Sequence, residues 1–532
     1  MNVTEPECQT VSQDCITRDG ATLRGTLMFP SSDDEPRQRP LLLQRTPYGF
    51  QQARYAGLNA AKAVKRGWNV WIQDVRGRHG SDGTFDPYIH EGRDGVDAVD
   101  WALASGVTDG RIVLYGASYS GAAALATARA DSSRIRGLAL MQAPVDLARD
   151  WAYRGGAFNL GERIAWTDIL RKNLDPYPEA EGGGPGGSAG KRSVLDTAYA
   201  KYLCALAAAV EEESPWAMAW WTHPAITRAR SFGESVSQEH ENAQLTSLNV
   251  PSFLIAGWWD PFLAGMLDLW HGCRMVPGSR LVVGPWTHGD LTGIQGGVDY
   301  GFESDARHRR LGRQILDWAE DVIANSPAGR VAESVFDLGD RSWKGQEWDT
   351  DASQGTASHI HEFEVELISE YREAPSFSSS IFSLTTLGSG PRVLGDSSGT
   401  RFLLRLEDLI SVGSVWDVEC TLNEVNGYWG LRYASPQDVA VRAILLLDRA
   451  GGGAQLEVLS DECVILPGTD GCSRTKWIAP MKCHDALARF KLVLVPSVFP
   501  VFPKLQEGVL STVRVSSVTT SGRALPNPAQ GR

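Results

Sequence analysis

The sequence is short of positive charge. Its 51 Lys and Arg residues stand against 64 Asp and Glu residues, which gives a formal net charge of -13 at pH 7. No block of basic residues interrupts this acidic surplus. A surface that binds nucleic acid needs such a block to neutralise phosphates, so we expect no nucleic-acid partner.

Long apolar runs are also missing. No stretch approaches the roughly 18 uninterrupted apolar residues that suffice for a membrane-spanning helix. The first residues, MNVTEPECQTVSQDC, contain neither the basic segment nor the apolar segment of a signal peptide. We therefore expect no membrane partner and predict a cytoplasmic location.

Cysteines at metal-ligand spacing are absent as well. The eight cysteines form no C-x-x-C pair, and Cys483 with His484 has no partner at zinc-ligand spacing. We expect no metal and no cofactor, and most of the thiols should be buried in a reducing compartment. Cys463 and Cys472 are the first candidates if any pair forms a disulfide.

Short apolar strands alternate with helices in two parts of the chain. In the first part the predicted strands are 40–48, 68–75, 110–116 and 136–144, and the predicted helices are 56–67, 92–105 and 119–130. In the second part the predicted strands are 250–260 and 279–288, with helices near 262–273 and 307–324. This alternation predicts a mostly parallel sheet with helices on both faces.

Two segments depart from the alternation. Residues 146–245 are rich in Ala and Trp and are predicted to be helical around a loop, EGGGPGGSAGKR, so we expect a helical cap inserted into the α/β domain. After residue 350, short β-rich runs separated by Gly, Asp, Ser and Pro predict an all-β, jelly-roll-like domain. The expected domains are an α/β core in two parts (1–145 and 246–345), the cap (146–245) and the β domain (350–532).

One predicted strand ends abruptly in small residues around a serine. The run IVLYGASYSG at 112–121 places Ser118 between a strand and a helix. A tight turn alone would produce such a string, but it is also typical of a nucleophile elbow. Asp260 and His288 end two later predicted strands, in the order Ser, acid, His. Because a serine hydroxyl needs a base and a group that orients the base, the three residues together predict a catalytic triad.

Several motifs in combination resemble one known family. GASYSG, RTPYG, DVRGRHGSDG, EGRDGVDAVDW, GWWD and GPWTH are similar to motifs of bacterial cocaine esterase, X-Pro dipeptidyl-peptidases and α-amino-acid ester hydrolases. The resemblance is dense over residues 20–290, and SVFPVFP at 497–503 is similar to a late motif of the family. It implies an α/β-hydrolase core with an inserted helical cap and a C-terminal jelly roll. Ser120 occupies the place of the second glycine of the usual G-x-S-x-G elbow, and Gly121 follows it.

The resemblance also implies roles for individual residues. Carried over position by position, it makes Ser118 the nucleophile, His288 the general base and then acid, and Asp260 the residue that orients His288. It implies an oxyanion hole made of the Tyr119 N–H and the Tyr48 hydroxyl. The first N–H groups of a helix are unpaired and favour negative charge, which agrees with the role implied for Tyr119.

The acyl pocket is expected to be apolar, and aromatic groups are its candidates. The segment that begins at Asp260, DPFLAGM, has no second carboxylate before Asp268, which argues against a substrate with a cationic α-amino group. By resemblance, Phe262 and the cap residue Trp166 line this pocket. Further candidates are Trp151 and Trp259, although core packing is the alternative for such aromatic residues.

The sequence therefore predicts a serine esterase that cleaves a small-molecule ester, or less readily an amide, through an acyl-enzyme. Three alternatives stay open: an acyltransferase with a non-water acceptor, an X-Pro dipeptidyl-peptidase, and a non-catalytic protein that binds a ligand with its jelly-roll domain. No acidic cluster for a free N-terminal amine is visible, and a disused site need not retain every catalytic part. A homodimer is compatible with the sequence.

Overall fold

A computed structural model provides the structure of the chain. It describes residues 8–146 and 248–345 apart from short gaps, single positions between 151 and 170, and the backbone of strands between 356 and 523. The predicted cap at 146–245 therefore lies almost entirely outside the described residues, as does its loop EGGGPGGSAGKR.

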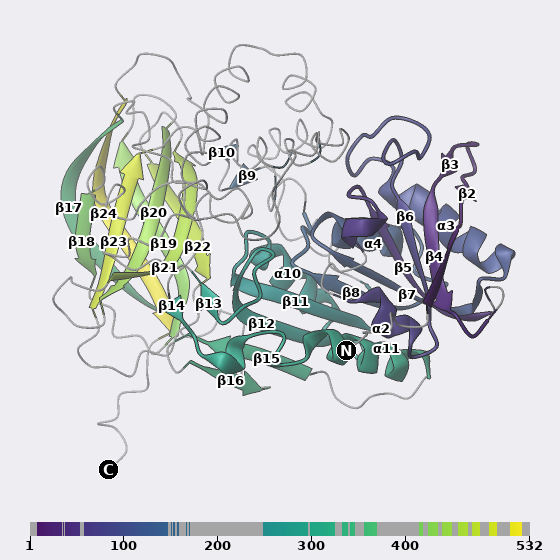
Figure 1. Cartoon of the computed structure of the whole chain (residues 1–532). Helices are drawn as coiled ribbons and strands as arrows, with labels where there is room; N and C mark the ends of the chain where they lie inside the picture. The colour runs from purple at the N-terminus through teal and green to yellow at the C-terminus, as the bar shows by residue number, and fades with distance from the viewer. Residues whose placement is uncertain are drawn as a thin grey trace, which may run out of the picture.

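A ten-stranded mixed sheet is the centre of the first two described segments (Figure 1). In spatial order its strands are β1 (Cys8–Ser12), β4 (Gly25–Pro30), β6 (Asn69–Asp74), β5 (Arg39–Thr46), β7 (Thr108–Ala117), β8 (Ile135–Met141), β11 (Ser252–Trp259), β12 (Arg280–Thr287), β15 (Ala332–Asp337) and β16 (Ser342–Gly345). Neighbouring strands from β6 to β15 pair in parallel. The pairs at the two edges are antiparallel.

Helices cover both faces of this sheet, because successive side chains of a buried strand point to opposite faces. Leu41 and Leu43 belong to one core cluster, and Leu42 between them belongs to another. The first cluster includes residues of α3 (Glu91–Ser105), α4 (Tyr119–Ala130) and α10 (Leu263–Cys273). The second includes residues of α2 (Ala60–Val64) and α11 (Leu311–Ile323), which lie side by side in Figure 1.

The predicted alternation of strands and helices is confirmed, and the bounds of α4 coincide with the prediction at 119–130. The structure adds strands at both edges of the sheet, namely β1 and β4 at one edge and β15 and β16 at the other. The two outermost strands, β1 and β16, are short and carry polar residues, so they leave no long apolar run in the sequence. Smaller elements are α1 (Phe50–Ala53), the 3-10 turn Phe302–Ser304, and the two-stranded pairs β2 (Cys15–Ile16) with β3 (Thr22–Leu23), β9 (Tyr153–Arg154) with β10 (Ala157–Phe158), and β13 (Ile294–Gln295) with β14 (Val298–Asp299).

The described strands after residue 350 form two antiparallel four-stranded sheets. One has the order β17 (Thr356–Ser369), β24 (Ser511–Arg523), β19 (Glu424–Ala434) and β22 (Gly471–Ile478). The other has the order β18 (Ser414–Val418), β23 (Arg489–Pro496), β20 (Val439–Asp448) and β21 (Leu456–Leu466). Five of the short β-rich runs of the sequence fall on described strands: HIHEFEVELIS on β17, VAVRAILLLD on β20, AQLEVLSDECVIL on β21, ARFKLVLVPS on β23 and VLSTVRVSSV on β24. A sixth run, TRFLLRLEDL, lies outside the described residues.

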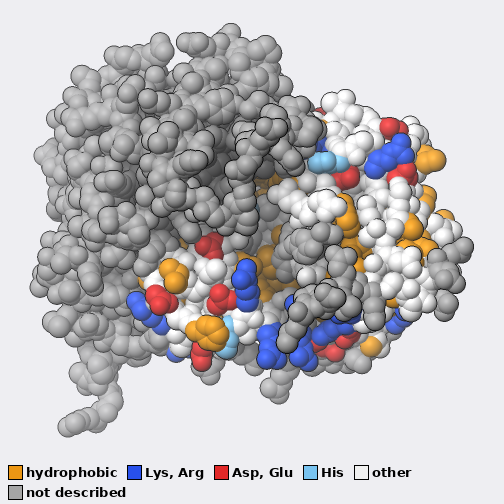
Figure 2. Space-filling model, in the orientation of Figure 1, with side chains coloured by type: hydrophobic (Ala, Val, Ile, Leu, Met, Phe, Trp, Pro, Cys, Tyr) orange, Lys and Arg blue, Asp and Glu red, His pale blue; other side chains and the backbone are white. Residues whose placement is uncertain are grey.

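The surface of the described residues carries mixed charge. On the face drawn in Figure 2, basic and acidic side chains are interspersed. Arg66, in the turn after α2, forms ion pairs with two acidic residues of α11, Asp317 at 2.7 Å and Glu320 at 3.3 Å. Within the part of the chain that the structure describes, no helix has the length and apolarity needed to cross a membrane.

Two glycines allow the tight turn between β7 and α4. A Cβ atom added at Gly116 would overlap the backbone carbonyl of Ser120, and one added at Gly121 would lie 2.6 Å from the Cβ of Ala143. The residue that packs closely against the segment after β8 is thus residue 121. The glycine of this elbow is therefore needed one residue later than in the usual motif, and a serine is accommodated at position 120.

We expect Gly116→Ala to destabilise the fold, because the added methyl group would meet backbone atoms that cannot rotate away. Overpacking of this kind costs about 1–3 kcal/mol of unfolding free energy. Gly345→Ala is the matched control, since the nearest atom to its added Cβ is the Glu333 carbonyl oxygen at 4.0 Å. Urea unfolding followed by tryptophan fluorescence measures both. Equal midpoints for the two variants would contradict the close packing at Gly116.

Candidate active site

The candidate site lies at one edge of the sheet, where the carboxyl ends of neighbouring parallel strands meet. Ser118 follows β7, Asp260 follows β11 and His288 follows β12. In the sheet these strands occur in the order β7, β8, β11, β12, and β5 lies on the other side of β7. Residues far apart in the chain are therefore brought to one edge, the usual place for a site in an α/β sheet.

Ser118 has a strained backbone that turns its side chain out of the strand. Its φ is 55° and its ψ is -127°, a combination that costs a non-glycine residue about 1–3 kcal/mol. Its N–H donates to the Met141 carbonyl at 3.0 Å, and its own carbonyl accepts from the N–H groups of Gly121 at 2.9 Å and Ala122 at 3.1 Å. The turn is thus fixed to β8 on one side and to the first turn of α4 on the other.

A chain of hydrogen bonds connects the three predicted triad residues. The Nε2 atom of His288 lies 3.0 Å from the Ser118 Oγ, and its Nδ1 atom lies 2.8 Å from the Asp260 Oδ2. The other Asp260 oxygen accepts the Phe262 N–H at 2.8 Å. The Asp260 side chain is 0% exposed and that of His288 is 12% exposed. With Nδ1–H donating to the carboxylate, Nε2 is left to accept the proton of the serine.

Tyr119 is the first residue of α4, and its side chain is anchored away from solvent. Its hydroxyl donates to Glu91 Oε1 at 2.7 Å and accepts the Tyr88 N–H at 3.2 Å. Burial raises the pKa of Tyr119 well above its usual value, and the nearby Glu91 raises it further. The Tyr119 N–H belongs to the first turn of the helix, whose N–H groups have no acceptor within the helix.

Tyr48 lies two residues beyond β5, on a turn that neighbouring side chains hold. Arg78 donates from Nε to the Pro47 carbonyl at 2.9 Å, and the Nε2 atom of His79 lies 3.1 Å from the same oxygen. The Tyr48 hydroxyl accepts the indole N–H of Trp166 at 3.0 Å. The structure therefore brings together Tyr48 and a residue of the predicted cap.

Buried charge lies close to this turn. Burial lowers the pKa of Arg78, while the nearby Tyr48 and Asp74 oppose that shift. Burial also raises the pKa of Asp74, to about 7, and Arg78 opposes it. One oxygen of Asp74 is buried without a hydrogen-bond partner, which agrees with a carboxyl group that is partly protonated near neutral pH.

An aromatic cluster packs beside His288. The ring of Trp151 lies 4.7 Å from that of Trp166 and 5.9 Å from that of Phe262, and the Phe262 ring lies 5.2 Å from that of His288. Trp151, Trp166 and Phe262 are all buried, and Tyr119 belongs to the same cluster.

The structure places Trp259, another residue predicted for the acyl pocket, in a different apolar cluster. Trp259 is buried in the core cluster shared with α3, α4 and α10, apart from the aromatic cluster around Trp166. The register of β11 against β12 shifts between Gly257 and Trp259. Trp259 follows this shift as the last residue of β11.

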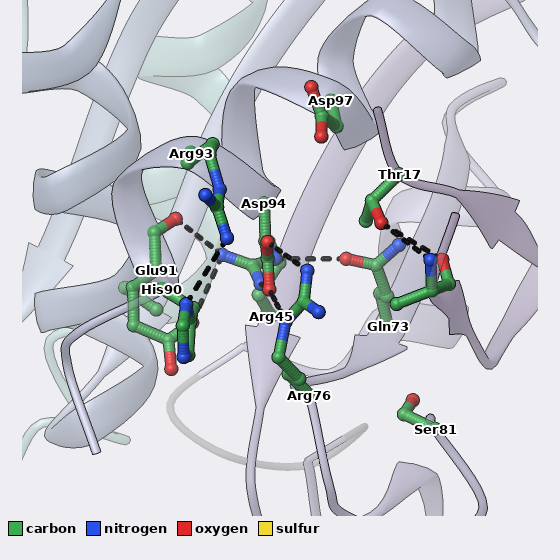
Figure 3. Close-up of polar contacts among 12 residues, drawn as sticks. Thr17, Arg45, Gln73, Arg76, Ser81, His90, Glu91, Arg93, Asp94 and Asp97 are labelled. Atoms are coloured by element: carbon green, nitrogen blue, oxygen red, sulfur yellow. Dashed lines mark hydrogen bonds and ion pairs between the residues drawn. The ribbon is translucent and has the colours of Figure 1, made fainter. Parts of the chain in front are cut away.

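A buried network of charges connects three of the quoted motifs (Figure 3). Arg45 of RTPYG lies 3.1 Å from Glu91 Oε2 and donates to the Glu91 carbonyl at 2.6 Å. Arg76 of DVRG forms two hydrogen bonds with Asp94, of 2.9 and 2.8 Å. Arg45 also donates from Nε to Gln73 at 2.9 Å. The network ties the start of α3 to the strand that leads to the Tyr48 turn.

Sequence reasoning quoted these motifs but gave their charged residues no role. Glu91 is the important case, because it binds both Arg45 and the hydroxyl of Tyr119. The sequence did carry a signal, since Arg45 stands near the end of an apolar strand. In the structure this arginine is 2% exposed. A buried arginine needs a carboxylate partner. Removing only one member of such a pair strongly destabilises the fold, because the other charge is then left buried and unpaired.

The two buried cysteines among the described residues, Cys15 and Cys273, carry protonated thiols. Burial raises the pKa of Cys15 to about 11 and that of Cys273 to about 12, so both thiols stay protonated at neutral pH. Among the described residues, no three His, Cys, Asp or Glu side chains are grouped so that they could hold a metal ion.

Solved structures share the fold of the chain. An α-amino acid ester hydrolase matches with a TM-score of 0.68 at 14% identity, over 97% of this chain and 96% of that one. An aminopeptidase from a marine sediment Thaumarchaeota archaeon matches with a TM-score of 0.66 at 16% identity, over 98% of both chains. A CocE/NonD family hydrolase from Staphylococcus aureus matches with a TM-score of 0.59 at 12% identity, over 98% of this chain and 97% of that one. The large mixed sheet is therefore that of an α/β-hydrolase-like fold.

Sequence comparison identifies the family. Cocaine esterase from Rhodococcus sp. (strain MB1 Bresler) is 27% identical over 344 residues, which are 62% of this chain and 58% of the esterase. The aligned part thus spans less than two thirds of that relative. The model of the family described as X-Pro dipeptidyl-peptidase (S15 family) matches residues 19–290. This match spans half of the chain and contains Ser118, Asp260 and His288, so the chain belongs to the X-Pro dipeptidyl-peptidase (S15) family.

Proposed function

We propose that the chain is a serine hydrolase that cleaves an ester of a small molecule through an acyl-enzyme at Ser118. The hydrogen-bonded series of Asp260, His288 and Ser118 carries this proposal, with distances of 2.8 and 3.0 Å. The names of two similar proteins, cocaine esterase and α-amino acid ester hydrolase, support an ester as the substrate. An amide is the less favoured substrate because its leaving group is poorer.

The reaction proceeds in two halves. The Oγ atom of Ser118 attacks the carbonyl carbon of the ester while Nε2 of His288 takes the serine proton. The tetrahedral intermediate collapses when His288 gives that proton to the leaving alcohol, and the acyl group stays on Ser118. Water then attacks the acyl-enzyme, His288 takes its proton, and the acid leaves as Ser118 is reprotonated. Asp260 keeps the imidazole oriented and stabilises its cationic form.

The oxyanion hole consists of the Tyr119 N–H and the Tyr48 hydroxyl. The Tyr119 N–H lies at the start of α4, where the partial charges of the helix favour an anion. The Tyr48 oxygen accepts a hydrogen bond from Trp166, and such a bond polarises the O–H group and strengthens it as a donor. The buried Arg78 cation beside Tyr48 favours negative charge in the same region.

The acyl pocket is formed by Trp151, Trp166 and Phe262. Their rings are buried and contact one another at centroid distances of 4.7 and 5.9 Å. Aromatic walls of this kind bury an apolar group, and edge-to-face contacts favour a ring. An apolar, and preferably aromatic, acyl group fits the pocket best.

The domain organisation that we propose keeps the predicted bounds of a core at 1–145 and 246–345, a helical cap at 146–245 and a jelly roll at 350–532. The pairing order of the C-terminal strands supports the last of these. Among the eight described strands, the first, β17, pairs with the last, β24, and the second, β18, pairs with the seventh, β23. The pair β19 and β22 extends one sheet, and the pair β20 and β21 extends the other. Two such four-stranded sheets are the pattern of a jelly roll.

Ser118→Ala should abolish ester turnover and labelling by a fluorophosphonate, because it removes the atom that forms the acyl-enzyme. The matched control is Ser120→Ala, a buried serine two residues away, which should keep both properties. Mass spectrometry of the labelled protein locates the adduct, and circular dichroism checks the fold. Ordinary turnover in the Ser118 variant would overturn the proposed function. Products formed with added alcohols or amines distinguish a hydrolase from an acyltransferase.

Tyr48→Phe should lower kcat strongly while KM moves little, because the hydroxyl acts mainly on the tetrahedral intermediate. Loss of one oxyanion donor costs about 10²–10³ in kcat. The ring remains, so the packing of the turn should hold. Pre-steady-state kinetics must show that acylation limits the rate. A variant within about threefold of the wild-type kcat would contradict this role.

Trp166→Ala should raise KM for aromatic acyl esters far more than for acetyl esters, because it removes one wall of the pocket. The structure adds a second effect, since this indole also donates to Tyr48 at 3.0 Å. Trp166→Phe keeps a smaller aromatic ring and removes the donor, so it should lower kcat for both substrates and change the ratio of their KM values less than Trp166→Ala does. An equal KM change for both esters in the alanine variant would rule out Trp166 as a residue that selects the acyl group.

A further inference from the structure

Gln142 occupies the end of β8, the strand that lies between the strand of Ser118 and that of Asp260. It is 2% exposed and its φ is 46°, in the left-handed region that a non-glycine residue rarely adopts. Such backbone strain persists only where the surroundings impose it, and it is concentrated at functional sites. The proposed mechanism gives this residue no role.

The side-chain amide of Gln142 binds the backbone on both sides of His288. Its Nε2 donates to the Thr287 carbonyl at 2.8 Å, and its Oε1 accepts the Gly289 N–H at 2.8 Å. A single side-chain amide thus forms hydrogen bonds to both residues that flank His288, one as donor and one as acceptor. The pairing also fixes the orientation of the amide, because a flipped group would oppose like atoms.

A glycine makes room for this contact. β11 lies between β8 and β12, so the Gln142 side chain has to cross the end of β11 to reach the His288 turn. A Cβ atom added at Gly257 would lie 2.9 Å from the Gln142 Nε2. The glycine of the GWWD motif therefore leaves the space through which the amide passes.

The backbone at the end of β8 is also bound to the nucleophile. The Met141 carbonyl accepts the Ser118 N–H at 3.0 Å, and the Gln142 N–H donates to the Ile255 carbonyl at 2.7 Å. Residues 141–142 thus hold the Ser118 turn through the backbone and the His288 turn through a side chain. The separation of Ser118 and His288 depends on this connection.

A second glutamine fixes the opposite side of the same turn. Oε1 of Gln295 accepts the Thr287 N–H at 3.1 Å and the Thr287 hydroxyl at 2.8 Å. Its Nε2 donates to the carbonyls of Asp290 at 3.1 Å and Thr292 at 2.8 Å. Gln295 thus holds the turn within its own segment. Gln142 links that turn to the strand next to Ser118.

We propose that Gln142 is a positioning residue, which holds the backbone around His288 so that Nε2 stays within hydrogen-bond distance of the Ser118 Oγ. The inference rests on the proposed hydrolase function. It assigns no chemical step to Gln142, because the amide contacts only the backbone on either side of the imidazole. Its effect is on the probability that the base and the nucleophile are in reacting geometry.

The first test is Gln142→Met, which keeps the length of the side chain and removes both hydrogen bonds. We expect kcat to fall about 10- to 100-fold, because a misplacement of about 1 Å in a catalytic group has an effect of this size. KM for the ester should stay within about threefold of wild type, since the acyl pocket is untouched. The matched control is Asn69→Leu: the Asn69 amide donates to the Val107 carbonyl at 2.8 Å, at the opposite end of the parallel strands. It should lower the unfolding midpoint and leave kcat unchanged.

The second test is Gln142→Glu, which also serves if the methionine variant fails to fold. A protonated glutamic acid can donate to Thr287 and accept from Gly289, whereas its anion opposes the Thr287 carbonyl. The ratio of kcat in this variant to that of wild type should therefore rise as the pH falls. Asp260, His288 and Asp290 lie on the surrounding strand ends and are present in both enzymes, so the ratio removes the contribution that the two enzymes share.

Two results would overturn the inference. One is a folded Gln142→Met enzyme with the kcat of wild type, and the other is a pH-independent ratio for Gln142→Glu together with a wild-type kcat. If wild-type protein hydrolyses esters and Ser118→Ala does not, either result removes only the role of Gln142. If Ser118→Ala retains turnover, the proposed function itself fails.

Discussion

The parallel hydrogen bonding of β5, β7, β8, β11 and β12 is the constraint on which the site depends. It aligns the carboxyl ends of strands that are separated by up to about 240 residues of chain and places them at one edge of the sheet. Ser118 and His288 contact each other only because this alignment holds. The apolar clusters on the two faces of the sheet supply the stability, and the edge supplies the polar groups.

Much of this arrangement could be predicted from the sequence, because strand ends and helix starts leave local signals. Small residues around Ser118 mark a tight turn, and Asp260 and His288 follow clear apolar runs. The contacts of Gln142 leave no such signal, since its partner Thr287 lies 145 positions away in the chain.

Buried charged residues hold the segments around Ser118 in place. Arg45 and Glu91 are both nearly inaccessible, and a pair like this contributes little net stability compared with apolar packing. Its value lies in geometry, because Glu91 also receives the Tyr119 hydroxyl at 2.7 Å. A hydrogen bond to a charged group in a low-dielectric interior is directional, so it fixes the first residue of α4. The charged residues of the family motifs therefore help to position Tyr119, whose N–H belongs to the proposed oxyanion hole.

Strain is concentrated around the same edge of the sheet. Six non-glycine residues in the described part of the chain have a positive φ, and four of them lie at or beside the site: Ser118, Gln142, His79 and Tyr88. The first carries the nucleophile, the second binds the His288 turn, the third contacts Pro47, and the fourth stacks on Tyr119 at 4.3 Å. Each such residue costs about 1–3 kcal/mol, so the sheet must offset several of them. Glycine would adopt a positive φ at these positions without this cost. In the proposed mechanism, these side chains hold Ser118, His288 and the two proposed oxyanion donors in place before substrate arrives, so the reaction needs little reorganisation.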